Sequence, residues 1–137
     1  MKYFSNERFA LQCTVAIFAL VPIAVGIAGM VAGQKMITHS IDNISLDSHF
    51  RYLSGLLFGI GICFWSLIPR IDAATPTFRL LTLLVFIGGL SRLAGIVMTG
   101  WPSPGMVFGL VMELIITPVL CLWQIRVAGK MRPMASA

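Results

Sequence analysis

Four long apolar runs are the feature that most limits what this chain can fold into. They lie at about residues 9–32, 49–68, 78–99 and 105–125. A helix of about 20 apolar residues spans the hydrocarbon core of a bilayer. With 58% hydrophobic and 11% charged residues, the chain is too apolar for a soluble domain, in which about a quarter of residues are charged. We predict an all-α fold, an integral membrane antiparallel four-helix bundle that forms a single domain over residues 1–137.

The basic residues predict how the bundle is oriented. The run at 9–32 exceeds the apolar core of a cleaved signal peptide, about 7 to 15 residues, so we expect a retained first helix. Most arginines and lysines fall in the amino-terminal arm, in the turn before residue 78 and after residue 125, where 127–137 is expected to be a loose tail. The positive-inside rule then places both termini in the cytoplasm. These residues form no basic face with interleaved aromatics, so we expect no nucleic-acid partner.

Arg92 and Glu113 are the charged residues between Phe86 and Thr117, one in the third run and one in the fourth. Arg92 lies seven positions before Thr99, which precedes the connector at 100–105, and Glu113 lies seven positions after Met106, which follows it. Each is therefore about 10 Å inside its helix end. An unpaired charge near the middle of a membrane helix costs about 2.5 to 3.5 kcal/mol on insertion scales. We therefore predict that Arg92 and Glu113 lie at one depth and pair with each other.

Glycines at helical spacing predict where helices approach closely, because small residues let membrane helices come into contact. Each of the four runs carries such positions. The predicted helix-packing residues are Gly26, Gly29, Gly55, Gly59, Gly88, Gly95 and Gly109. Kinks are expected at Pro22 and Pro118.

The start of the second helix carries a further polar group. Asp47 or Ser48 is expected to be its N-cap. Arg51 has two interpretations: it points into the glycine-lined groove as part of a binding site, or it extends to lipid phosphates with Asp47 as its i, i+4 partner. Ser54 is grouped with Arg51, Asp47, Arg92 and Glu113 as a candidate ligand-binding residue.

The sequence shows no sign of a catalytic or metal site. Cys13, Cys63 and Cys121 all fall inside apolar runs without a C-x-x-C spacing, so we expect small buried packing residues rather than metal ligands or disulfides. There is no H-E-x-x-H motif and no glycine-rich phosphate loop. We predict no catalytic residue, no metal and no cofactor.

Four short polar motifs carry a resemblance to a known family. They are Leu46-Asp47-Ser48-His49-Phe50-Arg51-Tyr52-Leu53-Ser54-Gly55, Gly88-Gly89-Leu90-Ser91-Arg92-Leu93, Glu113-Leu114 and Trp123-Gln124-Ile125-Arg126. With these motifs the chain resembles an uncharacterised bacterial four-helix membrane family, domain of unknown function 4345, and more distantly the redox-associated bundles called DoxX-like. The resemblance implies a four-helix bacterial membrane protein and transfers no catalytic residue.

Three functions fit this sequence. In the first, Arg51 and Arg92 outweigh Glu113 in the outer half of the bundle and bind a membrane lipid or a small anionic ligand. In the second, the Arg92–Glu113 pair fixes helix register in an accessory or assembly subunit of a larger membrane complex, or in a homo-oligomer. In the third, Glu113 relays protons in transport or catalysis. We favour the non-enzymatic binder.

Overall fold

The computed structural model describes residues 2–38 and 40–131, with side chains from Asn6 onward. Every regular element in these ranges is a helix, and four helical stretches are long and apolar enough to cross a membrane: Asn6–Ala32, Ile44–Arg70, Thr75–Thr99 and Pro104–Met131. The predicted all-α four-helix class is confirmed. The chain divides into two compact units, with Met1–Gln12 and Arg70–Ala137 in unit 1 and Cys13–Pro69 in unit 2.

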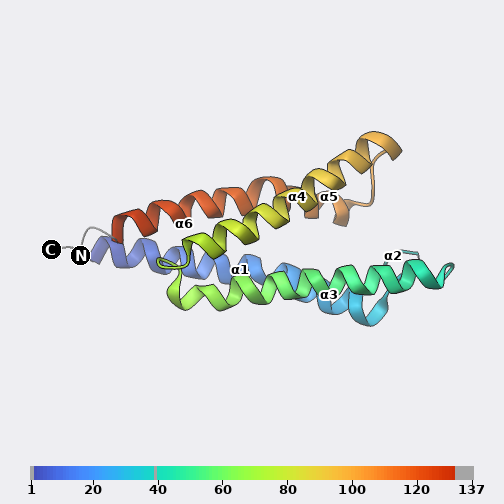
Figure 1. Cartoon of the computed structure of the whole chain (residues 1–137), viewed down its shortest axis with the longest axis horizontal. Helices are drawn as coiled ribbons and strands as arrows, with labels where there is room; N and C mark the ends of the chain where they lie inside the picture. The colour runs from blue at the N-terminus through green and yellow to red at the C-terminus, as the bar shows by residue number, and fades with distance from the viewer. Residues whose placement is uncertain (1, 39, 132–137) are drawn as a thin grey trace. The chain divides into compact units, whose positions relative to one another are not determined.

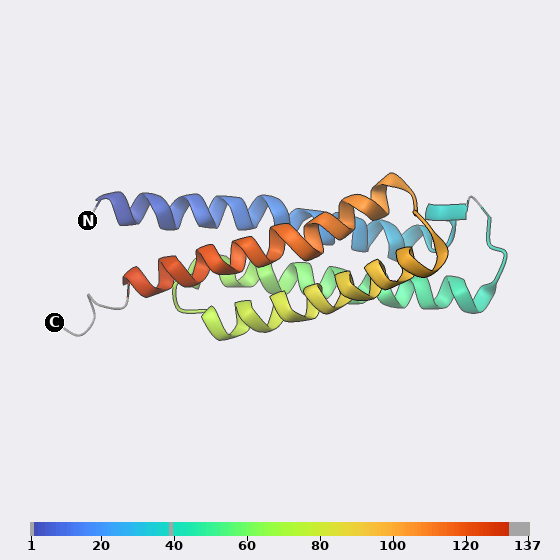
Figure 2. The ribbon, with the colours of Figure 1, turned by 90° about the horizontal axis from the view of Figure 1, so that it is seen from above.

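Unit 2 is a hairpin of two long helices. From Cys13 on it contains α1 (Lys2–Ala32), then the single turn α2 (Lys35–Thr38) and α3 (Ile44–Leu67). Figure 1 shows α3 returning alongside α1, and Figure 2 shows the same pair from above. Gly33 ends α1 at a φ of +57°, a left-handed conformation that glycine adopts without strain.

The N-cap of α3 differs from our prediction. Asn43, and not Asp47 or Ser48, is the cap, because its extended backbone lets its side-chain oxygen accept from the Leu46 N–H at 3.1 Å. The helix therefore begins five residues before the predicted His49. Asp47 falls in its first turn and is left available for other contacts.

Close helix contact in unit 2 follows the glycines of α1. A Cβ at Gly26 would lie 2.7 Å from the Cβ of Phe58, and Gly29 faces Ser54 in the same way. On α3 the close position is Gly61, against Ile23, whereas among the described residues no atom lies within 4 Å of a Cβ at Gly59. Gly26 and Gly29 thus lie in the contact between α1 and α3. The predicted Gly59 contact is not made, because the face of α3 that meets α1 carries Ser54, Phe58 and Gly61 instead.

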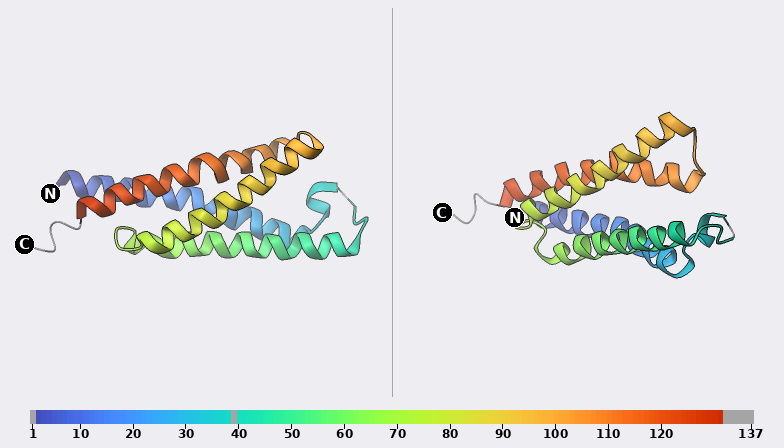
Figure 3. Two further views of the ribbon diagram at one scale, coloured as in Figure 1. Left: turned by 45° about the horizontal axis from the view of Figure 1, so that its top comes forward. Right: turned by 45° about the vertical axis from the view of Figure 1, so that its right-hand side comes forward.

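Unit 1 is built on a second hairpin. After the 3-10 turn η1 (Ile68–Arg70), α4 (Thr75–Thr99) runs out, and α5 (Pro104–Val111), the π-helical turn η2 (Met112–Ile116) and α6 (Thr117–Met131) return beside it. Figure 3 shows this pair in two further orientations. The tail predicted at 127–137 is wrong for residues 127–131, which continue α6, while 132–137 lie outside the described residues.

The π-helical turn was not predicted. Both the N–H and the hydroxyl of Thr117 bond to the carbonyl of Met112, five residues earlier, the hydroxyl at 2.8 Å. Pro118 follows directly and has no N–H to continue the helical ladder. The extra residue in this turn rotates the start of the fourth span relative to its end, and Glu113 lies inside it. Such π-turns are frequent at functional positions.

The three cysteines do not share the predicted burial. Cys121 is buried in unit 1, but Cys13 and Cys63 are exposed. All three lie in apolar runs, so an apolar run alone does not indicate which cysteines the protein buries.

Candidate functional site

The Arg92–Glu113 pair is the central polar feature of unit 1. Arg92 of α4 donates from Nε to Oε2 of Glu113 at 3.0 Å and from Nη2 to Oε1 at 2.9 Å. This two-bond geometry is the strongest that an arginine and a carboxylate form. The side chains of Arg92 and Glu113 are 33% and 18% exposed, so the pair lies at the side of the hairpin and is partly covered. The prediction that the two residues lie level and pair is confirmed.

Glycines make room for this pair. A Cβ at Gly89 would lie 2.9 Å from the Cβ of Glu113 and 2.7 Å from Leu114, so the side chains of the fourth span rest directly on the backbone of α4. Gly109 lies 3.7 Å from the Arg92 guanidinium by the same measure. At Gly109 this is ordinary van der Waals contact with a side chain, so its predicted helix-packing role stays a prediction. Gly89 takes the role predicted for Gly88, because the contact face of α4 is rotated by one residue.

A pocket of about 220 Å³ opens beside Arg92. Its walls include Gly95, Ile96 and Thr99 of α4 and Met106 of α5. The third nitrogen of the guanidinium, Nη1, contacts the thioether sulfur of Met106 at 3.0 Å. A thioether is a weak acceptor, so this N–H is held in a position where an oxygen would bind it better.

Arg51 belongs to a separate cluster in unit 2. Its Nε donates to Oδ2 of Asp47 at 2.8 Å, and its Nη1 donates to the carbonyl oxygens of Met30 at 2.6 Å and Val31 at 2.9 Å. These carbonyls belong to the last turn of α1, where helical carbonyls lack an internal partner. Arg51 therefore caps α1 from α3, with Asp47 as the i, i+4 partner that the sequence offered.

Asp47 and Ser54 complete the contact between the two helices. The other oxygen of Asp47 accepts from the backbone N–H of Gln34 at 2.7 Å, just past the end of α1. The Ser54 hydroxyl donates to the Phe50 carbonyl of its own helix at 2.8 Å and faces Gly29. The Asp47–Gln34 bond joins the start of the connection after α1 to the first turn of α3. The ligand-binding roles predicted for Arg51, Asp47 and Ser54 stay predictions.

The charges are more evenly matched than the sequence hypothesis assumed. That hypothesis set Arg51 and Arg92 against Glu113, with Asp47 as a nearby residue that modulates the balance. Each arginine instead has its own carboxylate, Asp47 at 2.8 Å within unit 2 and Glu113 at 2.9 Å within unit 1. Each pair is close to neutral as a unit, so attraction to a ligand at either arginine comes from directed N–H groups more than from excess charge.

Sequence reasoning missed a polar group near the ends of the unit 1 helices. Gln124 is fully buried and donates to the Ile71 carbonyl at 2.5 Å and to the Thr75 hydroxyl at 2.9 Å. Its Oε1 has no hydrogen-bond partner among the described residues. In the sequence, Gln124 is noted only in the motif Trp123-Gln124-Ile125-Arg126, at the predicted exit of the fourth helix.

Ion pairs join the same ends of unit 1. Glu7 of α1 pairs with Lys130 at 2.5 Å and with Arg126 at 3.4 Å, and Arg8 pairs with Asp72 at 2.8 Å. Within residues 6–38 and 40–131, no three histidine, cysteine, aspartate or glutamate side chains gather in a way that would hold a metal ion.

The comparisons with known proteins give a family and no activity. The family model described as Domain of unknown function (DUF4345) matches residues 10–124, which include both arginine pairs. No curated protein and no solved structure matches the chain.

Proposed function

The chain belongs to this family of unknown function, and we propose that it is a small multi-pass membrane protein that binds a lipid or small anionic ligand beside Arg92 without chemical turnover. The observation that supports this most directly is the contact of Arg92 Nη1 with the Met106 thioether at 3.0 Å. Nε and Nη2 are held by Glu113. The guanidinium is thus fixed in place with one N–H on a weak acceptor at a pocket wall.

The size of the pocket favours an amphiphilic ligand. At about 220 Å³ it is smaller than the roughly 300 to 1,000 Å³ of sites that enclose whole drug-sized molecules. It holds a polar head, and the rest of the ligand lies outside. Ile96 and Gly95 offer apolar contact next to Arg92. Because Glu113 already balances the charge, a carbonyl, carboxylate or phosphate oxygen that accepts from Nη1 is the chemistry we propose for the head.

Filling the pocket tests this proposal. Gly95→Leu places a side chain in the pocket, where no described atom lies within 4 Å of the new Cβ. We expect the wild-type chain, purified from native membranes, to carry a bound small molecule in native mass spectrometry, and Gly95→Leu to lose it. Gly88→Leu is the matched control, since Gly88 lies on the same helix, is equally open and does not line the pocket. Equal retention by both variants, or no ligand on the wild type, contradicts the proposal.

A second candidate function is that of an accessory or assembly subunit. The open positions at Gly59 and Gly88, where no described atom lies within 4 Å of an added Cβ, support it, because such faces accept a neighbouring helix. In this case the chain purified in mild detergent carries a larger partner in fixed ratio or forms a homo-oligomer. Gly88→Leu then removes the partner and leaves any ligand bound, which is the opposite of the result expected for Gly95→Leu.

We also propose a location in a bacterial inner membrane with both termini in the cytoplasm. The described basic side chains near the start of α1, the start of α4 and the end of α6 support this orientation; they are Arg8, Arg70, Arg79, Arg126 and Lys130. A green fluorescent protein fused after Ala137 is expected to fluoresce, and alkaline phosphatase at the same place to be inactive. An active phosphatase fusion would reverse the orientation.

A further inference from the structure

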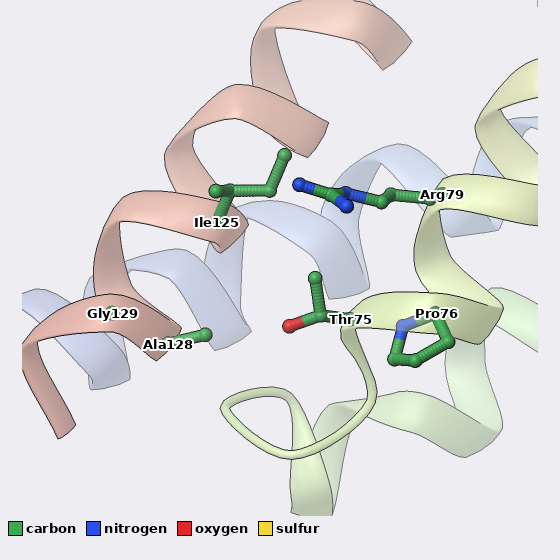
Figure 4. Close-up of a pocket in the computed structure, with 6 residues that line it drawn as sticks. All are labelled: Thr75, Pro76, Arg79, Ile125, Ala128 and Gly129. Atoms are coloured by element: carbon green, nitrogen blue, oxygen red, sulfur yellow. The ribbon is translucent and has the colours of Figure 1, made fainter. Parts of the chain in front are cut away.

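A second pocket lies in unit 1, between the first turn of α4 and the last turns of α6. Its volume is about 280 Å³, and it is lined by Thr75, Pro76, Arg79, Ile125, Ala128 and Gly129. Figure 4 shows the Arg79 side chain extending from α4 toward Ile125 of α6. The space exists because Ala128 and Gly129 are small, and no described atom lies within 4 Å of a Cβ at Gly129.

Arg79 pairs with no acid among residues 6–38 and 40–131. The described carboxylates near this pocket already have partners, Glu7 with Lys130 and Asp72 with Arg8. The described side chains at these helix ends include five basic residues, Arg8, Arg70, Arg79, Arg126 and Lys130, and two acidic ones, Glu7 and Asp72. The excess positive charge favours an anion at the pocket.

Thr75 offers a positioned donor on the same pocket. Its hydroxyl oxygen accepts from Nε2 of the buried Gln124 at 2.9 Å, so the oxygen is held in place while its own proton is available for an acceptor. The first turn of α4 adds the positive end of a helix dipole. Pro76, which also lines the pocket, has no N–H to donate, so the donors here are the guanidinium and the hydroxyl, both of which bind phosphate oxygens in proteins.

We propose that this pocket binds a phosphate group. The pocket lies at the beginning of the span Thr75–Thr99 and near the end of the span Pro104–Met131, which is the depth of phospholipid headgroups. The chemistry is shared by a membrane phospholipid and by free phosphate. Arg79 and Arg92 are thirteen residues apart on α4, about 20 Å along the helix, so this site is distinct from the pocket beside Arg92.

Lipid titration followed by native mass spectrometry tests the phosphate site. The delipidated full-length chain is titrated separately with dioleoylphosphatidylglycerol, with dioleoylphosphatidylcholine and with inorganic phosphate. We expect Arg79→Gln and Gly129→Leu each to weaken phosphatidylglycerol binding about tenfold, since one removes a charge-assisted bond and the other fills the pocket. Arg70→Gln and Gly105→Leu are the matched controls, because neither residue lines the pocket, and they should bind within about twofold of wild type.

The remaining arms identify the source of the phosphate. If phosphatidylglycerol stays bound in excess inorganic phosphate, the occupant is a phospholipid, and if inorganic phosphate displaces it with the same dependence on Arg79, the site takes the free ion. Weaker binding of phosphatidylcholine would show that net negative charge contributes. Wild-type affinity in Arg79→Gln overturns the proposal. An equal loss in Arg70→Gln also overturns it, because diffuse attraction to a basic end would then explain the binding.

Discussion

Arg92→Met is expected to lower the free energy of unfolding by about 3 kcal/mol, because it leaves the Glu113 carboxylate without its counter-charge in an apolar span. The substitution removes both bonds of the pair, at 2.9 and 3.0 Å. Unfolding in mixed detergent micelles, followed by circular dichroism against the fraction of denaturing detergent, gives the change. Arg70→Met is the control, because Arg70 is exposed, lines neither pocket, and its loss strands no carboxylate among the described side chains.

The double variant Arg92→Met/Glu113→Met separates the stability of the pair from its role in binding. Replacing both partners by apolar side chains of similar size is often neutral, so we expect its free energy of unfolding to return to within about 1 kcal/mol of wild type. We expect the double variant, like Arg92→Met, to retain no ligand, because both lack the N–H donor at Nη1. A double variant as unstable as Arg92→Met would show that the pair is not the cause of the loss. A stable double variant that still retains the ligand would remove Arg92 from the binding site.

The Arg92–Glu113 pair could be predicted because the sequence leaves each residue one partner. Between Phe86 and Thr117 there is one charge on each side of the short connector, at equal distances from it, and an unpaired charge is costly in a bilayer. Depth along the helix then follows from counting. The Arg51–Asp47 bond was foreseeable in the same way, from an i, i+4 spacing.

Helix rotation could not be predicted in the same way. Gly88 and Gly89 are adjacent, and both are compatible with a close helix contact, but only Gly89 meets Leu114. One residue turns a helix by about 100°, and the apolar residues of a membrane span surround the helix without marking the protein-facing side. The π-helical turn at Met112–Ile116 adds a further rotation that Pro118 alone does not indicate.

Contacts that depend on irregular backbone were also out of reach. Arg51 caps the carbonyls of Met30 and Val31 only because Gly33 turns the chain at a positive φ. Gln124 looked like a residue at the helix exit, yet it is fully buried against Ile71 and Thr75. In both cases the partner is a backbone carbonyl or a hydroxyl that no periodic sequence pattern marks. The sequence therefore identifies the polar residue but not the group that it contacts.

The second large effect on the free energy of unfolding is expected at Gly26, which lies in the observed contact between α1 and α3. Gly26→Ala places a Cβ 2.7 Å from the backbone nitrogen of Phe58 and 2.8 Å from its Cα. Backbone cannot move aside as a flexible side chain does, so α1 and α3 must separate. We expect a loss of about 2 to 3 kcal/mol in the free energy of unfolding, as for other overpacked interiors.

Gly59→Ala is the matched substitution on the other helix of this hairpin. No described atom lies within 4 Å of its new Cβ, and alanine is favoured over glycine inside a helix by about 0.5 to 1 kcal/mol. The variant should therefore be as stable as wild type or more so, and Gly55→Ala, at 3.6 Å from the Met30 sulfur, should be close to neutral. If Gly59→Ala were as damaging as Gly26→Ala when measured in the same micelles, the regular stripe of α3 and not the observed α1–α3 contact would be the packing surface.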